Sequence, residues 1–272
     1  MTFAAVDPHA SHSADVARAL TGARRAGAAL PDFPAAIPAT LAEAYEIQDA
    51  GLALWSDEVA GWKVGRVPDP LQATLGEERL SGPIFRRRVW DASSGEIAFP
   101  VFVGGFAAVE AEFVAVIGAD APDGQTEFSD VEAAALIGAV RIGVETAGSP
   151  LPAINDLGPT VVASDFGNNA GLILGGEIAD WTDRLYDIGI EAFVDGELVG
   201  RGGASSLPGG PVASVRFAAE HCARRGRPLK AGQLISTGAI TGIHEVTAGQ
   251  AARMVFAGVG AIACRAVAAV AE

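Results

Sequence analysis

The stretch "AAVEAEFVAVIG", from Ala107 to Gly118, decides how the chain must fold. Its Val, Phe and Ile residues predict a strand that enters the core, yet Glu110 and Glu112 lie near its start. Side chains two apart on a strand point to the same face, so the two carboxylates are expected side by side. Like charges repel, and burying each ion costs several kcal/mol unless it is paired. The pattern therefore predicts a positive group between them. The alternative is a strand face that is open to solvent.

A third carboxylate, Glu145, follows in "RIGVETAGSP" (residues 141–150). We expect it at the end of an apolar strand, just before a Gly/Pro turn, where binding residues are common. Three carboxylates with no nearby Cys or His ligands favour a hard divalent cation such as Mg²⁺, Mn²⁺ or Ca²⁺. In the alternative reading, Glu145 is an unrelated charge at a strand end.

A cationic side chain is available in "GWKVG" (residues 61–65), where small and apolar residues surround Lys63. A lysine in this setting can anchor a substrate carboxylate, or act as an acid or base with a lowered pKa. The alternative is an ordinary strand lysine whose amine reaches solvent along the protein surface.

Composition excludes several classes of protein. The chain has 272 residues, 50% of them hydrophobic, and a net charge of −14. Such acidity argues against nucleic acid or an anionic membrane as partner. Cys222 and Cys264 show no metal-binding spacing, so we expect a reducing, cytoplasmic compartment. No apolar stretch approaches the length of a membrane span, and no signal peptide is apparent.

The order of elements predicts an α+β protein. Residues 13–61 have helical periodicity, and Thr40 and Ser129 each begin a capping-box pattern. Short apolar runs broken by Gly then predict strands, with a hairpin turn at Asp195–Gly196 and a helix over residues 211–225. Strands and helices do not alternate strictly, which favours a mixed or antiparallel sheet with flanking helices. Nucleotide-binding glycine motifs are missing from the sequence.

From about residue 41 to residue 267, the chain resembles a known family. The matching stretches include "GWKVG", "VEAEFVAVIGAD", "GVETAGS", "SDFGNNAGLILGG" and "GQLISTGAIT". In order and spacing they are similar to the 2-oxopent-4-enoate (2-hydroxypenta-2,4-dienoate) hydratase group of the fumarylacetoacetate hydrolase superfamily. The resemblance implies a mixed β-sheet folded on itself with flanking helices, in a homo-oligomer. We expect an N-terminal helical segment over residues 1–80 and a catalytic domain over residues 81–272.

The resemblance also implies a set of site residues. The metal is Mg²⁺ or Mn²⁺, and its expected ligands are Glu110, Glu112 and Glu145. The expected catalytic residues are Lys63, Asp165 and Glu145, and the expected substrate contacts are Lys63, Asn168 and Thr237. In this scheme Lys63 anchors a carboxylate or moves protons, and Glu145 or Asp165 orients water.

The activity that the resemblance implies is hydration of a small 2-hydroxydienoate or 2-oxoalkenoate acid in aromatic meta-cleavage catabolism. The acid chelates the metal, which stabilises the enolate while water adds farther along the chain. A decarboxylase of the 4-oxalocrotonate type and an acylpyruvate C–C hydrolase need the same electron sink, so both remain alternatives. A non-catalytic partner subunit is a further alternative.

Several residues depart from the hydratase pattern. Arg66 and Val67 replace Leu-Thr after the lysine motif, and "LGEERLSGPIF" (residues 75–85) lacks the usual acidic pair and Pro. Residues 169–171 replace a pair of serines and a Gly, and an unusual His244 stands near the expected mouth of the site. These changes predict altered pocket walls around an intact metal site. His244 is either a replacement acid or base or an exposed loop residue.

Overall fold

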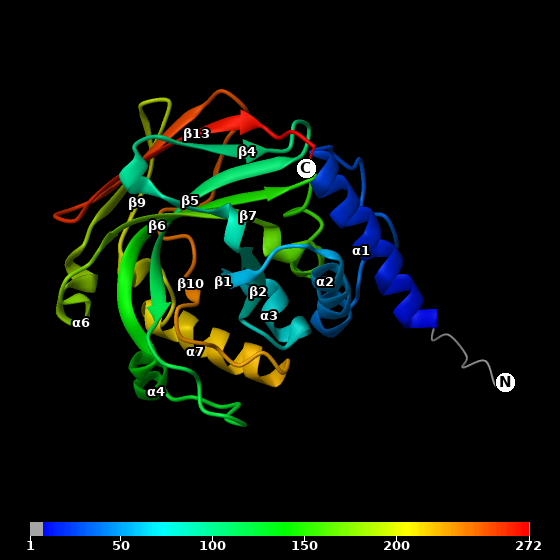
Figure 1. Ribbon diagram of the computed structural model, residues 1–272, viewed down its shortest axis with the longest axis horizontal. Helices are drawn as coiled ribbons and strands as arrows, with labels where there is room; N and C mark the ends of the chain where they lie inside the picture. Colours follow the sequence, from blue (N-terminus) through cyan, green and yellow to red (C-terminus); the bar gives the residue numbers. More distant parts are fainter. Residues whose placement is uncertain (1–7, 272) are drawn as a thin grey trace.

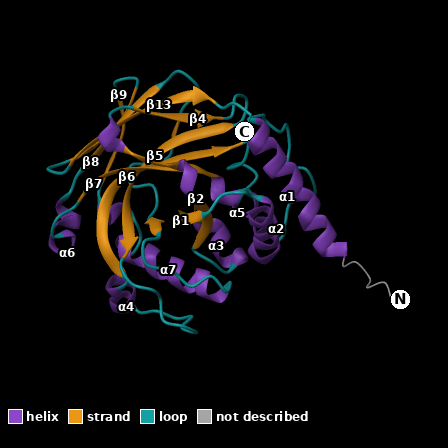
Figure 2. Ribbon diagram, in the orientation of Figure 1, coloured by secondary structure: helices purple, strands orange, loops and turns teal. Residues whose placement is uncertain are grey.

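A computed structural model describes residues 8–271 of the chain. Two β-sheets pack against each other, and most of the helices lie on the side of the larger sheet that faces away from the smaller sheet (Figures 1 and 2). Both parallel and antiparallel pairs occur, which confirms the expected mixed α+β architecture. Within the described residues, no helix combines the length and the apolar character needed to cross a bilayer.

The larger sheet has eight strands in the order β2-β1-β10-β5-β6-β7-β3, with β11 paired to one end of β5. Its two longest strands, β5 and β6, are paired along almost their whole length and curve strongly in Figure 1. Their bounds and those of their neighbours are β1 Val59–Arg66, β2 Arg79–Phe85, β3 Val89–Asp91, β5 Phe106–Ile117, β6 Ile137–Ser149, β7 Asn169–Glu177, β10 Leu234–Ser236 and β11 His244–Glu245.

The smaller sheet has five strands in the order β4-β13-β12-β8-β9. The expected hairpin at Asp195–Gly196 joins β8 to β9, and both of its turn residues have positive φ. The bounds are β4 Ile97–Val101, β8 Ile190–Val194, β9 Glu197–Gly202, β12 Ala251–Phe256 and β13 Gly260–Ala268.

The helices lie where the capping patterns predict, with one difference. The Thr40 hydroxyl accepts from the Glu43 N–H at the start of α2, and Ser129 and Glu132 form a full capping box at α4. However, α4 ends at Ala135, because the apolar run that follows enters β6. The bounds are α1 Pro8–Ala26, α2 Leu41–Leu54, α3 Asp69–Leu75, α4 Asp130–Ala135, α5 Pro159–Ser164, α6 Trp181–Arg184 and α7 Gly210–Arg224. Short 3₁₀ turns are η1 Arg86–Arg88, η2 Ala92–Ser94, η3 Phe166–Asn168, η4 Leu185–Asp187 and η5 Ala204–Ser206.

Strand β5 is buried on both faces, which explains its continuous apolar character. Val109, Ala111 and Phe113 pack into the core between the two sheets. Glu110 and Glu112 alternate with these residues and therefore point to the opposite face. They are not on a solvent-exposed face, because both are buried.

The division expected at residue 80 falls inside β2. Strand β1, from the segment expected to be helical, pairs with β2 on one side and with β10, near the other end of the chain, on the other side. Backbone hydrogen bonds therefore cross the expected boundary. Helices α1 and α2 of the same segment pack with the ends of β5 and β6.

Buried His221 on α7 makes folding sensitive to acid. Its ring lies against Phe217 and Tyr45, and burial, with Arg225 and Arg224, lowers its pKa from 6.5 to about 3. The unfolded chain therefore binds a proton between these values that the folded chain does not, so stability falls as pH drops below 6.5. His221→Phe is expected to remove about 2 kcal/mol of the stability loss between pH 7 and pH 4.5, as measured by urea unfolding. The same change at exposed His12 should leave the acid-induced loss of stability as large as in the wild type. If the stability of His221→Phe fell with pH in parallel with that of the wild type, the prediction would be wrong.

Candidate metal centre and substrate cavity

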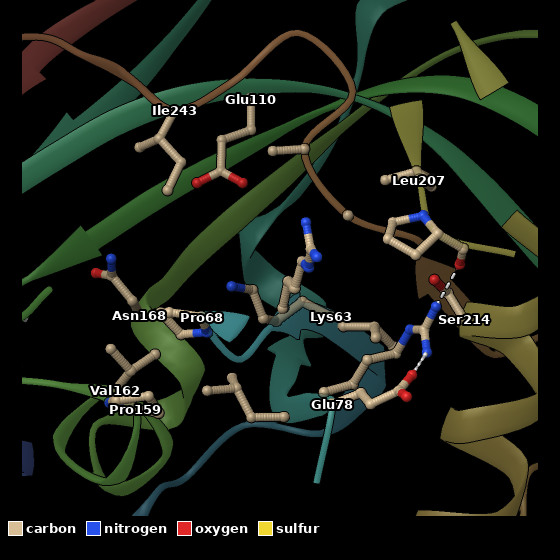
Figure 3. A pocket seen from close by; sticks show the side chains of 18 of the residues that line it. Lys63, Pro68, Glu78, Glu110, Pro159, Val162, Asn168, Leu207, Ser214 and Ile243 are labelled. Carbon is tan, nitrogen blue, oxygen red and sulfur yellow. Dashed lines mark hydrogen bonds and ion pairs between the residues drawn. The ribbon is translucent and has the colours of Figure 1, made fainter. Parts of the chain in front are cut away.

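A cavity of about 480 Å³ opens on the face of the larger sheet that carries Glu110. Segments far apart in sequence form its wall: β1 and β2, α5 with η3, the start of α7, and the loop after β10. Figure 3 shows Glu110 and Glu78 on opposite sides of this space, with Lys63 between them. The volume suits a small organic acid rather than a macromolecule.

The three predicted carboxylates lie together, and one of them, Glu110, lines this cavity. Glu145 on β6 pairs directly with Glu110 on β5, and one oxygen from each of Glu110, Glu112 and Glu145 lies within 4.8 Å of the others. All three are buried. Glu145 is in the middle of β6, and not at a strand end as expected, because β6 continues to Ser149.

The electrostatics of this group fit a divalent cation. Burial, followed by repulsion from Glu145, raises the pKa of Glu110 to about 8, against the opposing effect of Lys63. Burial also raises the pKa of Glu112, with contributions from Glu145 and Glu110. One oxygen of Glu112 and one of Glu145 are buried without a hydrogen bond in the described structure. Three hard oxygen donors with unpaired lone pairs are a suitable ligand set for Mg²⁺ or Mn²⁺.

Lys63 provides the positive group that the sequence pattern required. Its Nζ lies 3.5 Å from Oε1 of Glu145, and the side chain is buried, so it is not a strand lysine that reaches solvent. Burial lowers the Lys63 pKa, but the three carboxylates more than offset it and the pKa is raised. Neighbouring glycines allow the close packing: a Cβ on Gly61 would lie 2.0 Å from the Leu234 carbonyl oxygen.

Asn168 and Thr237, the predicted substrate contacts, both line the cavity. Asn168 lies in a turn in which Phe166, Gly167 and Asn168 all have positive φ, and its Oδ1 is buried without a hydrogen bond in the described residues. Such backbone strain costs about 1–3 kcal/mol per non-Gly residue and is typical of functional sites. The Thr237 hydroxyl instead donates to the Phe113 carbonyl oxygen, which leaves its lone pairs for a ligand.

Asp165, the predicted water-orienting residue, requires a correction. It does not line the cavity, and Arg24 on α1 donates to both of its oxygens at 2.6 and 2.9 Å. The Ser149 hydroxyl donates to it as well. The carboxylate is therefore the counter-ion that fixes α1 to the sheet, because a buried arginine cannot remain unpaired.

Asp165→Asn is expected to destabilise the fold and leave the chemistry of the folded fraction unchanged. Losing one charge of this buried pair should cost about 3 kcal/mol and lower the melting temperature by about 6–10 °C. Asp15→Asn is the matched control, since its partner Arg18 is on the same helix but both side chains are exposed. A normal melting temperature with lost turnover would restore the catalytic assignment.

His244 is placed beside the site but not in it. The neighbouring Ile243 lines the cavity, whereas His244 is in β11 with Nε2 3.1 Å from the Thr241 hydroxyl oxygen. Burial lowers its pKa.

The sequence did not predict that Arg79, Glu78 and Gln72 form the outer wall of the cavity. The only signal was that they fall in or beside segments that depart from the hydratase pattern.

Comparisons with known proteins show which proteins share this fold. No family model matches the chain. The fold is shared with a fumarylpyruvate hydrolase from Pseudomonas aeruginosa in complex with Mn²⁺ and pyruvate, at a TM-score of 0.55 and 20% identity, over 76% of this chain and 89% of that one. The same fold is found in a protein from Yersinia pestis assigned to the fumarylacetoacetate hydrolase family, and it agrees with the mixed sheet and flanking helices that the resemblance implied.

Higher similarity is found with 4-oxalocrotonate decarboxylases. The structure of this enzyme from Pseudomonas putida G7, complexed with magnesium and adipate, matches at a TM-score of 0.79 and 22% identity, over 94% of this chain and 98% of that one. In sequence, the chain is 32% identical to 4-oxalocrotonate decarboxylase from Pseudomonas putida over 105 residues, 38% of this chain. The matched stretch spans 40% of that curated relative. The two solved structures described above thus contain Mg²⁺ or Mn²⁺ together with a small carboxylic acid, and the expectation of Mg²⁺ or Mn²⁺ is supported.

Proposed function

We propose that this protein is a divalent-metal-dependent enzyme that removes CO₂ from a 2-oxoalkenoate carrying a second carboxylate. The observation that carries the proposal is the buried group of Glu110, Glu112 and Glu145 beside Lys63, with Glu110 and Lys63 lining the cavity. A scaffold without ligands has no physical need to bury so much charge, which argues against a non-catalytic subunit. Similarity to 4-oxalocrotonate decarboxylases supports this reaction over hydration, the activity first implied by the sequence.

In the proposed reaction, residues of the chain bind the acid and supply a proton to it. When bound by the three carboxylates, the cation would supply Lewis-acid polarisation of the 2-oxo group. Lys63 is placed to pair with the carboxylate next to that group, or to deliver a proton to the 2-oxo oxygen. Asn168 offers amide donors from the opposite wall.

Decarboxylation makes the smallest chemical demand on the residues of the cavity wall. When the bond to the second carboxylate breaks, CO₂ leaves and its electron pair moves through the conjugated chain to the 2-oxo oxygen, where a proton is taken up. This step needs no base to activate water. Among the described residues that line the cavity, the acidic side chains are Glu110 in the metal group and Glu78 at the outer wall, and His is missing. Hydration or C–C hydrolysis would need such a base beside the substrate.

The test is product analysis with 2-oxohex-3-enedioate and with Mg²⁺, Mn²⁺ or a chelator. We expect metal-dependent release of one CO₂ per substrate, with a product lighter by that mass and without the mass of an added water. A net gain of one water without CO₂ release would establish a hydratase instead, and cleavage of the carbon chain would establish a hydrolase. Absence of turnover with any of these metals would overturn the proposal.

A further inference from the structure

The outer wall of the cavity concentrates positive charge although the chain as a whole is strongly acidic. Arg66 and Arg79 both line it. They are also direct partners in the antiparallel pair of β1 and β2. Like charges directly opposite each other on paired strands are destabilising, so an anion bound beside them would relieve the repulsion.

Arg79 is the member of this pair that is built into the wall. Its side chain is only 11% exposed, and one guanidinium nitrogen donates to the Pro208 carbonyl oxygen at 2.5 Å. Its carboxylate partner, Glu78, is 3.5 Å away on a side chain that is 72% exposed, as the dashed line in Figure 3 marks. Burial lowers the Arg79 pKa, Glu78 opposes this, and the nearby Arg216 and Arg66 lower it further. The guanidinium is therefore short of negative charge.

Arg66 is in a different situation. Its side chain is 55% exposed, and it pairs with Asp69 three residues later in the chain. A solvated pair of this kind contributes little to binding. Arg79, fixed by Pro208 and desolvated, retains a planar set of donors that can bind a carboxylate through two hydrogen bonds.

We propose that Arg79 binds the second carboxylate of the substrate and so makes the site selective for dicarboxylic 2-oxo acids. Arg79 lies directly opposite Arg66, three residues after Lys63, so by strand alternation Arg79 and Lys63 project from opposite faces of the β1–β2 pair. Both side chains nevertheless line the same cavity, Lys63 beside the three carboxylates and Arg79 at the outer wall beside Pro208. The cavity therefore offers one cation to each carboxylate of a dicarboxylic acid.

Arg79 acts in this scheme on substrate selection rather than on bond breaking. The departing carboxylate loses its charge as CO₂ leaves, so this contact stabilises the bound substrate more than the transition state. Removing the contact should therefore raise KM without lowering kcat. Glu78 competes for the same guanidinium, so its loss should not weaken binding of the acid.

The inference rests on the proposed function, and the experiment separates the two. Calorimetry with Mg²⁺-loaded protein compares 2-oxoadipate with 2-oxohexanoate, which has a methyl group in place of the second carboxylate. We expect the wild type to bind 2-oxoadipate about tenfold more tightly or better, and Arg79→Gln to lose this preference while it retains its affinity for 2-oxohexanoate. Glu78→Gln should keep or increase the preference. Arg216→Gln is the matched control, because Arg216 is near Arg79 but pairs with Asp130 outside the cavity.

The remaining outcomes of the binding experiment would contradict the role of Arg79, the proposed function or both. A preference that survives in Arg79→Gln, or that is already missing in the wild type, overturns the role of Arg79. Metal-dependent binding of 2-oxohexanoate would in that case leave the proposed function standing. If neither acid binds, with or without Mg²⁺, both the inference and the proposed function fail. Loss of the preference in Arg216→Gln would show a general charge effect and would also overturn the specific assignment.

Discussion

Glu112→Gln is expected to reduce metal-dependent turnover by about 10³-fold or more, with little harm to the fold. Oε2 of Glu112 already accepts from the Ser236 hydroxyl at 2.5 Å and from the Gly238 N–H at 2.8 Å. The other oxygen is buried without a hydrogen bond and is the atom that would face a cation. Gln preserves the shape of the side chain but removes its charge, so the hard cation loses one of its three anionic ligands.

The same substitution should affect stability in the opposite direction. In the metal-free protein, Glu112 is buried near two further carboxylates, and burial and repulsion both oppose its charge. Metal-free Glu112→Gln is therefore expected to melt at or above the temperature of the metal-free wild type. Added Mg²⁺ should raise the melting temperature of the wild type and raise that of the variant much less.

Glu78→Gln is the matched control for this prediction, because it removes a carboxylate from the outer wall of the same cavity. It should retain both turnover and stabilisation by Mg²⁺. If Glu112→Gln kept its Mg²⁺-induced shift in melting temperature and its turnover, the three glutamates would not be the metal site.

The first two candidate metal ligands could be placed side by side from sequence because strand alternation is a local rule. Two residues apart in one apolar run, Glu110 and Glu112 had to share a face, and they do so in β5. The third ligand depends on register. Glu145 lies directly opposite Glu110 because β5 and β6 pair over almost their full length, and no local pattern reveals that alignment. The resemblance to a known family provided what local rules could not.

Asp165 shows why the rest of the site could not be predicted. A motif can predict that an acidic residue lies near a cavity. It does not reveal which cationic side chain pairs with that residue. Here the partner is Arg24, 141 residues earlier in the chain, on a helix that the motif does not include. Arg79 was missed for the same reason: its position opposite Arg66 and its burial against Pro208 both arise from tertiary packing.

Lys63→Met is expected to lower kcat/KM by about 10³-fold while the protein still binds Mg²⁺. Met has a similar length and tolerates the apolar surroundings, so the fold should be retained. The kinetic constants then distinguish the two possible roles of Lys63. A rise in KM with kcat unchanged identifies it as the anchor of the substrate carboxylate, whereas a fall in kcat identifies it as the proton donor.

Lys230→Met is the matched control for Lys63→Met, since Lys230 forms an exposed pair with Asp120 far from the cavity lining and should be neutral in kinetics. Calorimetric titration with Mg²⁺ measures whether the metal site remains intact when Lys63 is replaced. Because Lys63 is a cation 3.5 Å from Glu145, its removal should leave Mg²⁺ affinity equal or higher. Normal kcat/KM in Lys63→Met would exclude it from the reaction and reduce its role to that of counter-ion to the buried carboxylates.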